Sequence, residues 1–224
     1  MSEIHNEITV IQSTVGVKKD LVIFDVGACN FVDTMHLKRH FPHAKIYSFE
    51  PNVENIKLHA PLAESQGAIV VPVAISDKND LITFYNSVTH DGAGSTLKPV
   101  VKENTTEGIY HDGVFYDMSG YDVQCVRLDT FCELNEIHHI DYLHIDVQGA
   151  EHNVIRGLGK YRPYFIFAET CEFGTYESGT TLEEFEKDLH GMGYEVVNRF
   201  RDDTLYKLKT EFTNFKINNW LPKI

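Results

Sequence analysis

The sequence predicts an α/β fold with a doubly wound, mainly parallel sheet. Short apolar runs, typical of strands buried on both faces, alternate with segments whose apolar residues have helical spacing. Near the end of the chain, residues 194–199 and 204–208 form two strand patterns joined by the polar turn 201–203, which predicts an antiparallel hairpin. Alternating strands and helices followed by such a hairpin favour an open sheet with helices on both faces.

Length and charge narrow the class of protein. With 224 residues and 42% hydrophobic content, the chain fits one α/β domain with a sizeable core. Its net charge of −13 disfavours a nucleic-acid backbone or an anionic membrane as the main partner. We therefore expect a small-molecule substrate.

The cysteines and the N-terminus indicate a cytoplasmic protein. Acids at Glu3 and Glu7, and the lack of a long apolar run, indicate neither a signal peptide nor a membrane span. The cysteines make no CxxC pair and lie in or beside apolar segments, which predicts reduced, packed thiols and no metal site. They are Cys29, Cys125, Cys132 and Cys171.

The predicted fold is organised around residues 21–31 (LVIFDVGACNF). Four apolar residues run into an acid, a glycine and two small residues, which predicts a buried strand ending in a tight turn before a helix. Cofactors of open α/β sheets lie outside the carboxyl end of the first strand, where the next helix offers free N–H groups. Gly27 would leave room for a cofactor, so we expect no side chain to be tolerated there. Ala28 would keep the turn thin, and Asp25 would bond the ligand or fix the loop.

A second strand end favours a ligand site over a purely structural corner, which the first stretch fits equally well. Residues 45–51 (KIYSFEP) form a short strand that ends in Glu50, about 20 residues further on, where a carboxylate can bind a ribose diol. Two matched strand ends are much less expected by chance.

The first half of the chain contains three predicted helices. Residues 1–20 contain a helical stripe at residues 3–16, which we expect to pack on the domain as a cap, a lid or a homodimer contact. A second helix spans residues 33–40. Asn52 caps a third helix, which Pro61 should break or kink.

The middle of the chain carries two strands and a long irregular segment. Residues 68–75 predict a third buried strand, and residues 81–85 a short strand that pairs with residues 121–128 as an extra hairpin. Between them, residues 86–120 follow neither period. Their aromatic side chains favour a cover on the substrate side over a disordered linker.

The remaining elements continue the alternation inside a domain of residues 21–210, followed by a tail, residues 211–224. Two helices have candidate caps: Asp129 before the first, and Thr180 or Thr181 before the second. The expected elements are a helix to residue 137, a strand at 141–146, a helix at 151–158, a strand at 164–168 and a helix at 182–191.

With these pieces placed, the chain resembles the FkbM-type methyltransferases over about residues 20–200. The likeness rests on four stretches in the right order: residues 25–29 (DVGAC), 49–51 (FEP), 126–129 (VRLD) and 145–151 (IDVQGAE). The resemblance implies a class I methyltransferase fold, Rossmann-like, with seven strands in the order 3-2-1-4-5-7-6 and strand 7 antiparallel. It also implies S-adenosylmethionine as methyl donor and a hydroxyl acceptor on a sugar or natural product.

The resemblance also implies roles for individual residues. Asp25 and Gly27 would lie at the methionine and ribose end of the cofactor, Glu50 at the ribose diol and Asp77 near the adenine. Two departures stand out. The family's glycine a few residues after Gly27 is absent, so Phe31 could wall the pocket instead. The family's basic residue and acid on either side of Asp146 are here His144 and Gln148.

Methyl transfer to a hydroxyl needs near-attack geometry, exclusion of water and a base. Asp146 is the first candidate base; a helix-capping or loop-ordering acid is the alternative. His144 is the second candidate, with the loop histidines His90 and His111. Glu151 complements a helix dipole, and Glu169 could line the acceptor pocket.

Two rival functions remain at this point. A nicotinamide-dependent oxidoreductase on a similar sheet is disfavoured, because the first turn lacks the G-x-G-x-x-G pattern. A methyltransferase-like small-molecule binding protein that has lost catalysis stays open.

Overall fold

The computed structural model describes residues 4–15, 20–87, 93–99, 110–111, 114–115, 117, 119–170 and 180–210. Its centre is a seven-stranded sheet in the order β12-β13-β11-β10-β1-β2-β3, in which β13 runs antiparallel to β11 and β12. This is the predicted order, with the predicted antiparallel strand. The strands are β1 (Val22–Val26), β2 (Lys45–Phe49), β3 (Ile69–Val71), β10 (Tyr142–Ile145), β11 (Phe165–Glu169), β12 (Tyr194–Arg199) and β13 (Asp203–Leu208).

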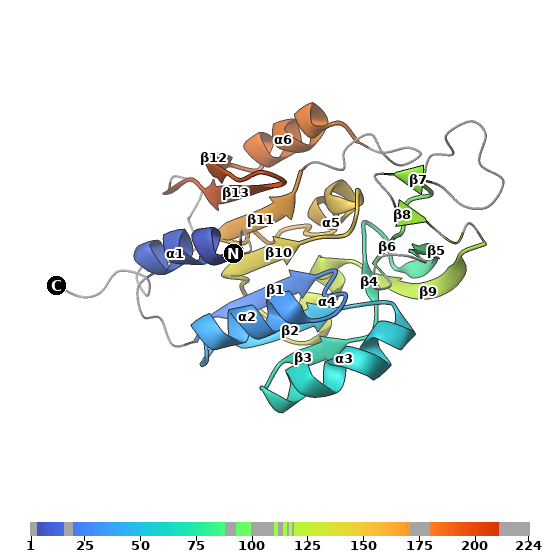
Figure 1. Ribbon diagram of the computed structural model, residues 1–224. Coiled ribbons are helices and arrows are strands. Elements are labelled where there is room, and N and C mark those ends of the chain that lie inside the picture. Colours follow the sequence, from blue (N-terminus) through green and yellow to red (C-terminus); the bar gives the residue numbers. More distant parts are fainter. Residues whose placement is uncertain are drawn as a thin grey trace.

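Helices cover both faces of this sheet (Figure 1). One face packs α4 (Leu128–Leu134), α5 (Glu151–Arg156) and α6 (Leu182–Gly191) through a cluster that includes Phe24, Leu143 and Ile166. The other face packs α1 (Ile4–Val15) and α2 (Val32–His40), with α3 (Val53–Ser65) in an adjoining cluster of small side chains. The result is the three-layer arrangement that a doubly wound sheet requires.

A second, smaller sheet lies beyond the carboxyl ends of the central strands (Figure 1). It has the order β4-β9-β5-β6, and β5 and β9 form the expected antiparallel hairpin. Its strands are β4 (Ala74–Ile75), β5 (Asp80–Asn86), β6 (Gly94–Ser95) and β9 (Tyr121–Val126); β7 (Tyr110–His111) and β8 (Val114–Phe115) pair separately.

The third strand differs from the prediction of one buried strand at residues 68–75. The chain leaves the main sheet after Val71 and joins the second sheet at Ala74 as β4. Pro72 lies between the two strands and has no N–H to donate to a ladder. The outer strand β3 is only partly buried, because it forms an edge of the main sheet.

Two of the predicted helix N-caps are confirmed and one is wrong. Asn52 accepts from the backbone N–H groups of Glu54 and Asn55, and Thr181 forms a capping box with Glu184. Asp129 does not cap α4, because the helix begins at Leu128 and Asp129 lies in its first turn. The Asp129 carboxylate accepts from the Arg127 guanidinium.

Pro61 does not break α3, which continues to Ser65, so of the two predicted effects, a break or a kink, the break is wrong. It lies on the exposed side of the helix. There, water can solvate the carbonyl that a proline leaves without a partner.

Parts of two predictions lie outside the described residues. Of the predicted cover at residues 86–120, the structure describes residues 93–99, the strand β6 among them, and little of the remainder; the tail at 211–224 lies outside entirely. Within the described part of the chain, no helix combines the length and apolar character needed to cross a membrane.

Helix α1 places an acid in the core. Ile8 and Ile11 pack against Ile23 and Ile46, while Glu7 on the same helix is fully buried. Neither Glu7 carboxyl oxygen has a hydrogen-bond partner. Burial raises the pKa of Glu7 to about 8, so the side chain stays protonated in the folded protein at neutral pH.

This acid should make stability fall as pH rises. The unfolded chain releases the Glu7 proton near the ordinary pKa of 4.5, whereas the folded protein releases it only near pH 8. The contribution of protonated Glu7 to the free energy of unfolding is therefore complete below pH 4.5 and is lost as the pH rises to 8. Glu7→Gln should therefore raise the melting temperature relative to wild type by roughly 5 °C at pH 8, with a much smaller gain at pH 5. Thermal unfolding followed by circular dichroism across this range measures the difference. Glu64→Gln, on an exposed helical position, is the control; an equal gain at both pH values would contradict the assignment.

Candidate active site

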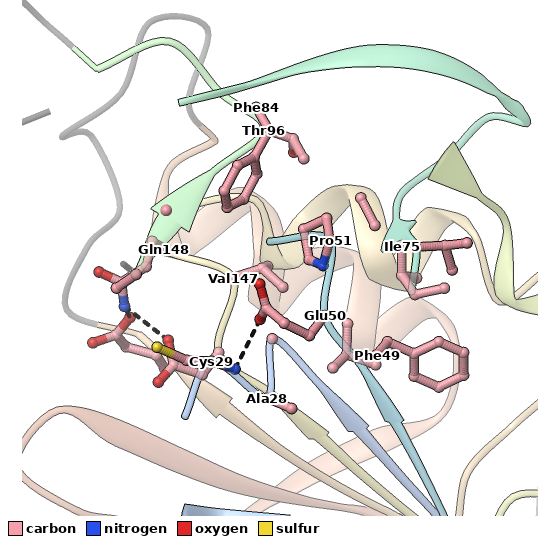
Figure 2. Close-up of a pocket in the computed structure, with 18 of the residues that line it drawn as sticks. Ala28, Cys29, Phe49, Glu50, Pro51, Ile75, Phe84, Thr96, Val147 and Gln148 are labelled. Carbon is pink, nitrogen blue, oxygen red and sulfur yellow. Dashed lines mark hydrogen bonds between the residues drawn. The ribbon is translucent and has the colours of Figure 1, made fainter. Parts of the chain in front are cut away.

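A pocket of about 500 Å³ opens at the carboxyl ends of the central strands. Its floor comes from the turns after β1, β2 and β10 and from Glu169 of β11; its roof comes from Phe84 of β5 and from residues 93–96 around β6. Figure 2 shows Glu50 in the middle, Phe84 and Thr96 above it, and Gln148 to one side. The pocket thus collects side chains from both sheets.

The sequence-predicted site residues divide into two groups. Gly27, Ala28, Glu50 and Asp146 line the pocket; Asp25, Asp77 and His144 are not among the lining residues. Gly27, Glu50 and Asp146 follow the ends of β1, β2 and β10, whereas Asp25 and His144 lie within β1 and β10, below the edge of the sheet. Asp77 follows β4 of the second sheet.

Gly27 has a left-handed backbone, with φ of 91°. A Cβ at this position would lie 1.7 Å from the backbone oxygen of Asp146. The space beside the Gly27 Cα is therefore occupied by the protein backbone at the end of the neighbouring strand β10. The expected requirement for glycine holds, but its first physical cause is backbone packing.

The amide groups of the first turn bind the end of β2. Gly27 N–H and Ala28 N–H both donate to the Phe49 carbonyl, each at 3.0 Å. Cys29 N–H donates to Glu50 Oε2 at 2.8 Å (Figure 2). The N–H groups of these three turn residues are therefore bonded within the protein; the expectation of free N–H groups concerned the following helix, α2.

Phe31 takes the conformation that a glycine usually supplies. Its φ is 60° and that of Cys29 is 45°, both in the left-handed region, which is unfavourable for a bulky residue. The Phe31 ring is completely buried with Ala28, Ala60 and Ala63, and this packing offsets the backbone strain. Phe31 does not line the pocket, so it supports the turn from behind.

Glu50 is fixed by the two turns that it joins. Its Oε1 accepts from Asn52 N–H at 2.7 Å, and its Oε2 accepts from Cys29 N–H. The side chain is 4% exposed. Burial raises the pKa of Glu50 to about 8 although both N–H donors lower it, and the nearby carboxylates of Asp25 and Asp146 raise it further.

Gln148 connects the ends of β10 and β11. Its Nε2 donates to Asp146 Oδ1 at 2.7 Å and to Glu169 Oε2 at 2.9 Å (Figure 2). The turn that carries it is ordered by buried Glu151, whose Oε1 accepts from the N–H groups of Val147 and Gly149. Glu151 therefore shapes the turn after β10, in addition to standing in the first turn of α5.

Asp25 and His144 form a buried pair beneath the pocket. His144 Nδ1 lies 2.8 Å from Asp25 Oδ1, and Thr34 donates to the other Asp25 oxygen. Burial lowers the pKa of His144, but the hydrogen bond to Asp25 and the charges of Asp25, Asp33 and Asp146 outweigh it and raise the pKa to about 10. A protonated, buried imidazole at neutral pH cannot accept a substrate proton.

The other predicted site residues are Asp77 and the loop histidines His90 and His111. The carboxylate of Asp77 accepts from the Ser76 hydroxyl, outside the pocket lining. Residue His90 and the side chain of His111 lie outside the described part of the chain. Among the described residues, no group of three or more His, Cys, Asp or Glu side chains is arranged to hold a metal ion.

Sequence reasoning missed Asp33. It lies in the first turn of α2 and lines the pocket, and burial raises its pKa to about 6. An acid in the first turn after a ligand-side strand is the signal that could have identified it. With Glu50, Asp146 and Glu169 it gives the pocket four acids, and no Lys, Arg or His is among the described lining residues.

A seven-stranded sheet in this order, with one antiparallel strand and a pocket at the carboxyl ends of its central strands, defines a class I methyltransferase fold. Residues 25–196 match the family model described as Methyltransferase FkbM domain. The chain belongs to this family, as its motifs predict.

The chain is similar to several proteins of known name. The chain is 31% identical over 180 residues to "2-O-methyltransferase NoeI" of Sinorhizobium fredii, covering 74% of this chain and 69% of the relative. It is 26% identical to "Methyltransferase 1" of Beauveria bassiana, covering 62% and 59%. Among solved structures, the precorrin-6y C5,15-methyltransferase of Geobacter metallireducens matches at a TM-score of 0.47 and 12% identity, covering 91% of this chain and 89% of that one.

The contact between Gly27 and β10 predicts a specific loss of stability. Gly27→Ala should lower the melting temperature by roughly 5 °C or more, because the new Cβ must displace the Asp146 backbone. Gly191→Ala is the matched control: nothing lies within 4 Å of its Cβ position in α6. Because Gly191 is the last residue of α6, alanine there should leave the melting temperature unchanged or raise it slightly. Thermal unfolding measures the melting temperatures of both variants. Equal melting temperatures would show that the Asp146 backbone does not restrict the side chain at residue 27.

Proposed function

We propose that the protein transfers a methyl group from S-adenosylmethionine to a hydroxyl group of a sugar or natural product. The observation that carries the donor assignment is Glu50, a buried acid at the end of β2 that lines the pocket. A carboxylate at this place suits the ribose diol of a nucleoside cofactor. The net positive charge of the sulfonium donor also fits a pocket lined by four acids.

The order of the strands suggests how the donor would lie. The adenine would contact the apolar side of the pocket, at Phe49 and Ile75, the ribose would meet Glu50, and the methionine part would cross the turn at Ala28. The sulfonium supplies an activated methyl group. Asp25, which is buried with His144 and Thr34, would support this turn from below without touching the donor. Asp77, outside the lining, would act on the adenine only through its neighbours.

The acceptor assignment rests on the family and on one relative. The relative named a 2-O-methyltransferase shares 31% identity over 69% of its length. A hydroxyl acceptor must lose a proton as its oxygen attacks the methyl carbon. Asp146 lines the pocket on the side of β10 and is the base that the geometry favours. His144 is less suited, because it is buried, bonded to Asp25 and protonated at neutral pH.

Residues 86–120 would act as a cover over the acceptor. Ala93, Gly94 and Thr96, from the described part of this segment, line the pocket. Closing such a segment would exclude water before transfer.

Two measurements test the function directly. Calorimetry with S-adenosylmethionine tests donor binding, and release of S-adenosylhomocysteine with candidate acceptors tests transfer. A protein that binds the donor and transfers nothing would be a methyltransferase-like binding protein. Absence of donor binding would contradict the proposal.

Donor affinity should rise with pH because Glu50 must be ionised to accept two ribose O–H groups. Since its pKa is about 8 in the free protein, the dissociation constant should fall by about tenfold or more between pH 6 and pH 8. Glu50→Gln should weaken binding at pH 8 by about 1–3 kcal/mol and flatten the pH dependence. Calorimetry measures both effects. Glu54→Gln, an exposed acid on α3, is the control, and wild-type affinity in Glu50→Gln would remove Glu50 from the site.

A further inference from the structure

One side of the pocket is built differently from the donor side. In the sheet, β2 lies on one side of β1, and β10 and β11 lie on the other. Glu50 therefore stands on the β2 side, whereas Asp146, Gln148 and Glu169 stand on the β10 side. If the ribose binds at Glu50 and the methionine part crosses the turn after β1, the acceptor must approach from the side of β10.

On this side, a single amide group holds two carboxylates. The two hydrogens of Gln148 Nε2 go to Asp146 and to Glu169, one to each. Because the amide is planar, the two accepting oxygens lie roughly 5 Å apart. Two carboxylates this close repel each other, and the amide hydrogens offset part of that repulsion by donating to both.

The position of Gln148 is fixed before any ligand arrives. Its backbone is left-handed, with φ of 54°, and Gly149 follows with φ of 89°. Glu151 holds the N–H groups on both sides of Gln148, at 3.1 Å from Val147 and 3.2 Å from Gly149. An unfavourable backbone held in place in this way directs the amide between the two acids.

The charges of the pocket restrict the acceptor. The described lining contains four acids and no cationic side chain, so a phosphate or carboxylate on the acceptor would be repelled by these acids. Hydroxyl groups donate to carboxylates, and an amino group would be attracted. Thr96 on the roof adds a buried hydroxyl oxygen that has no hydrogen-bond partner.

We propose that Asp146, Gln148 and Glu169 form the acceptor subsite, and that it takes neighbouring hydroxyls of a neutral or amino-bearing sugar. This inference rests on the proposed function. Asp146 takes the proton of the reacting hydroxyl while the oxygen of that hydroxyl bonds to the methyl carbon. The bond between the methyl carbon and sulfur breaks, and its electron pair stays on sulfur. Glu169 binds the second hydroxyl. Gln148 is a positioning residue, which keeps both acids in place.

The test compares variants on a panel of acceptors. Methyl glycosides and their amino-sugar analogues are set against uronic acids and glycosyl phosphates of the same sugars, with S-adenosylhomocysteine release as the readout. Gln148→Leu and Glu169→Gln should each lower kcat/KM for the preferred acceptor by tenfold or more, with donor affinity by calorimetry within threefold of wild type. In Gln148→Leu the acid limb of the pH–rate profile should also move to higher pH. Gln124→Leu and Glu195→Gln, matched changes at exposed positions of β9 and β12, should alter none of these.

The outcomes distinguish failure of the acceptor subsite from failure of the proposed function. Preference for an anionic acceptor, unchanged kcat/KM in both variants, or donor binding without methylation of any neutral or amino-bearing glycoside would each overturn the acceptor subsite. If wild type fails to bind S-adenosylmethionine, the proposed function itself is wrong. Glu169→Gln leaves the backbone at Gln148 intact, so a folding defect of Gln148→Leu does not remove the test.

Discussion

The close packing of the turn after β1 against the end of β10 is the constraint on which the site depends. No atom beyond Cα fits at Gly27, because the Asp146 carbonyl occupies that space. The same turn is bonded to Phe49 and Glu50 at the end of β2. Three strand ends are thereby fixed relative to one another before a ligand binds. A donor and an acceptor that contact different strands are then held in one geometry, as in-line transfer requires.

The electrostatics around the pocket follow from burying several acids close to His144. Glu7, Glu50 and Glu151 each have a pKa raised to about 8, chiefly by burial. His144 is held protonated by the acids around it, and it balances the charge of Asp25. The pocket can therefore remain acidic in composition without carrying the full repulsion of its carboxylates.

The fold was largely predictable from the sequence, whereas the site was predictable only in part. Signals that act over a few residues, such as the capping box at Thr181, can be recognised in one dimension. The bridge from Gln148 to Glu169 cannot, because its partner is 21 residues away on another strand. The partner of a side chain is equally hidden: Asp25 and His144 belong to the ligand-side motifs, yet they bond to each other and do not line the pocket. The exposed position of Pro61 explains why α3 continues through it without a break.

The floor and the roof of the pocket belong to separate sheets, and this division has an evolutionary consequence. The roof comes from β5, β6 and their connections, a hairpin extension with its own small core around Phe84 and Val123. Mutations in the small core of that extension change residues that belong to none of the strand ends of the floor. Descendants of one ancestral chain can therefore diverge in what they modify while inheriting the same transfer machinery.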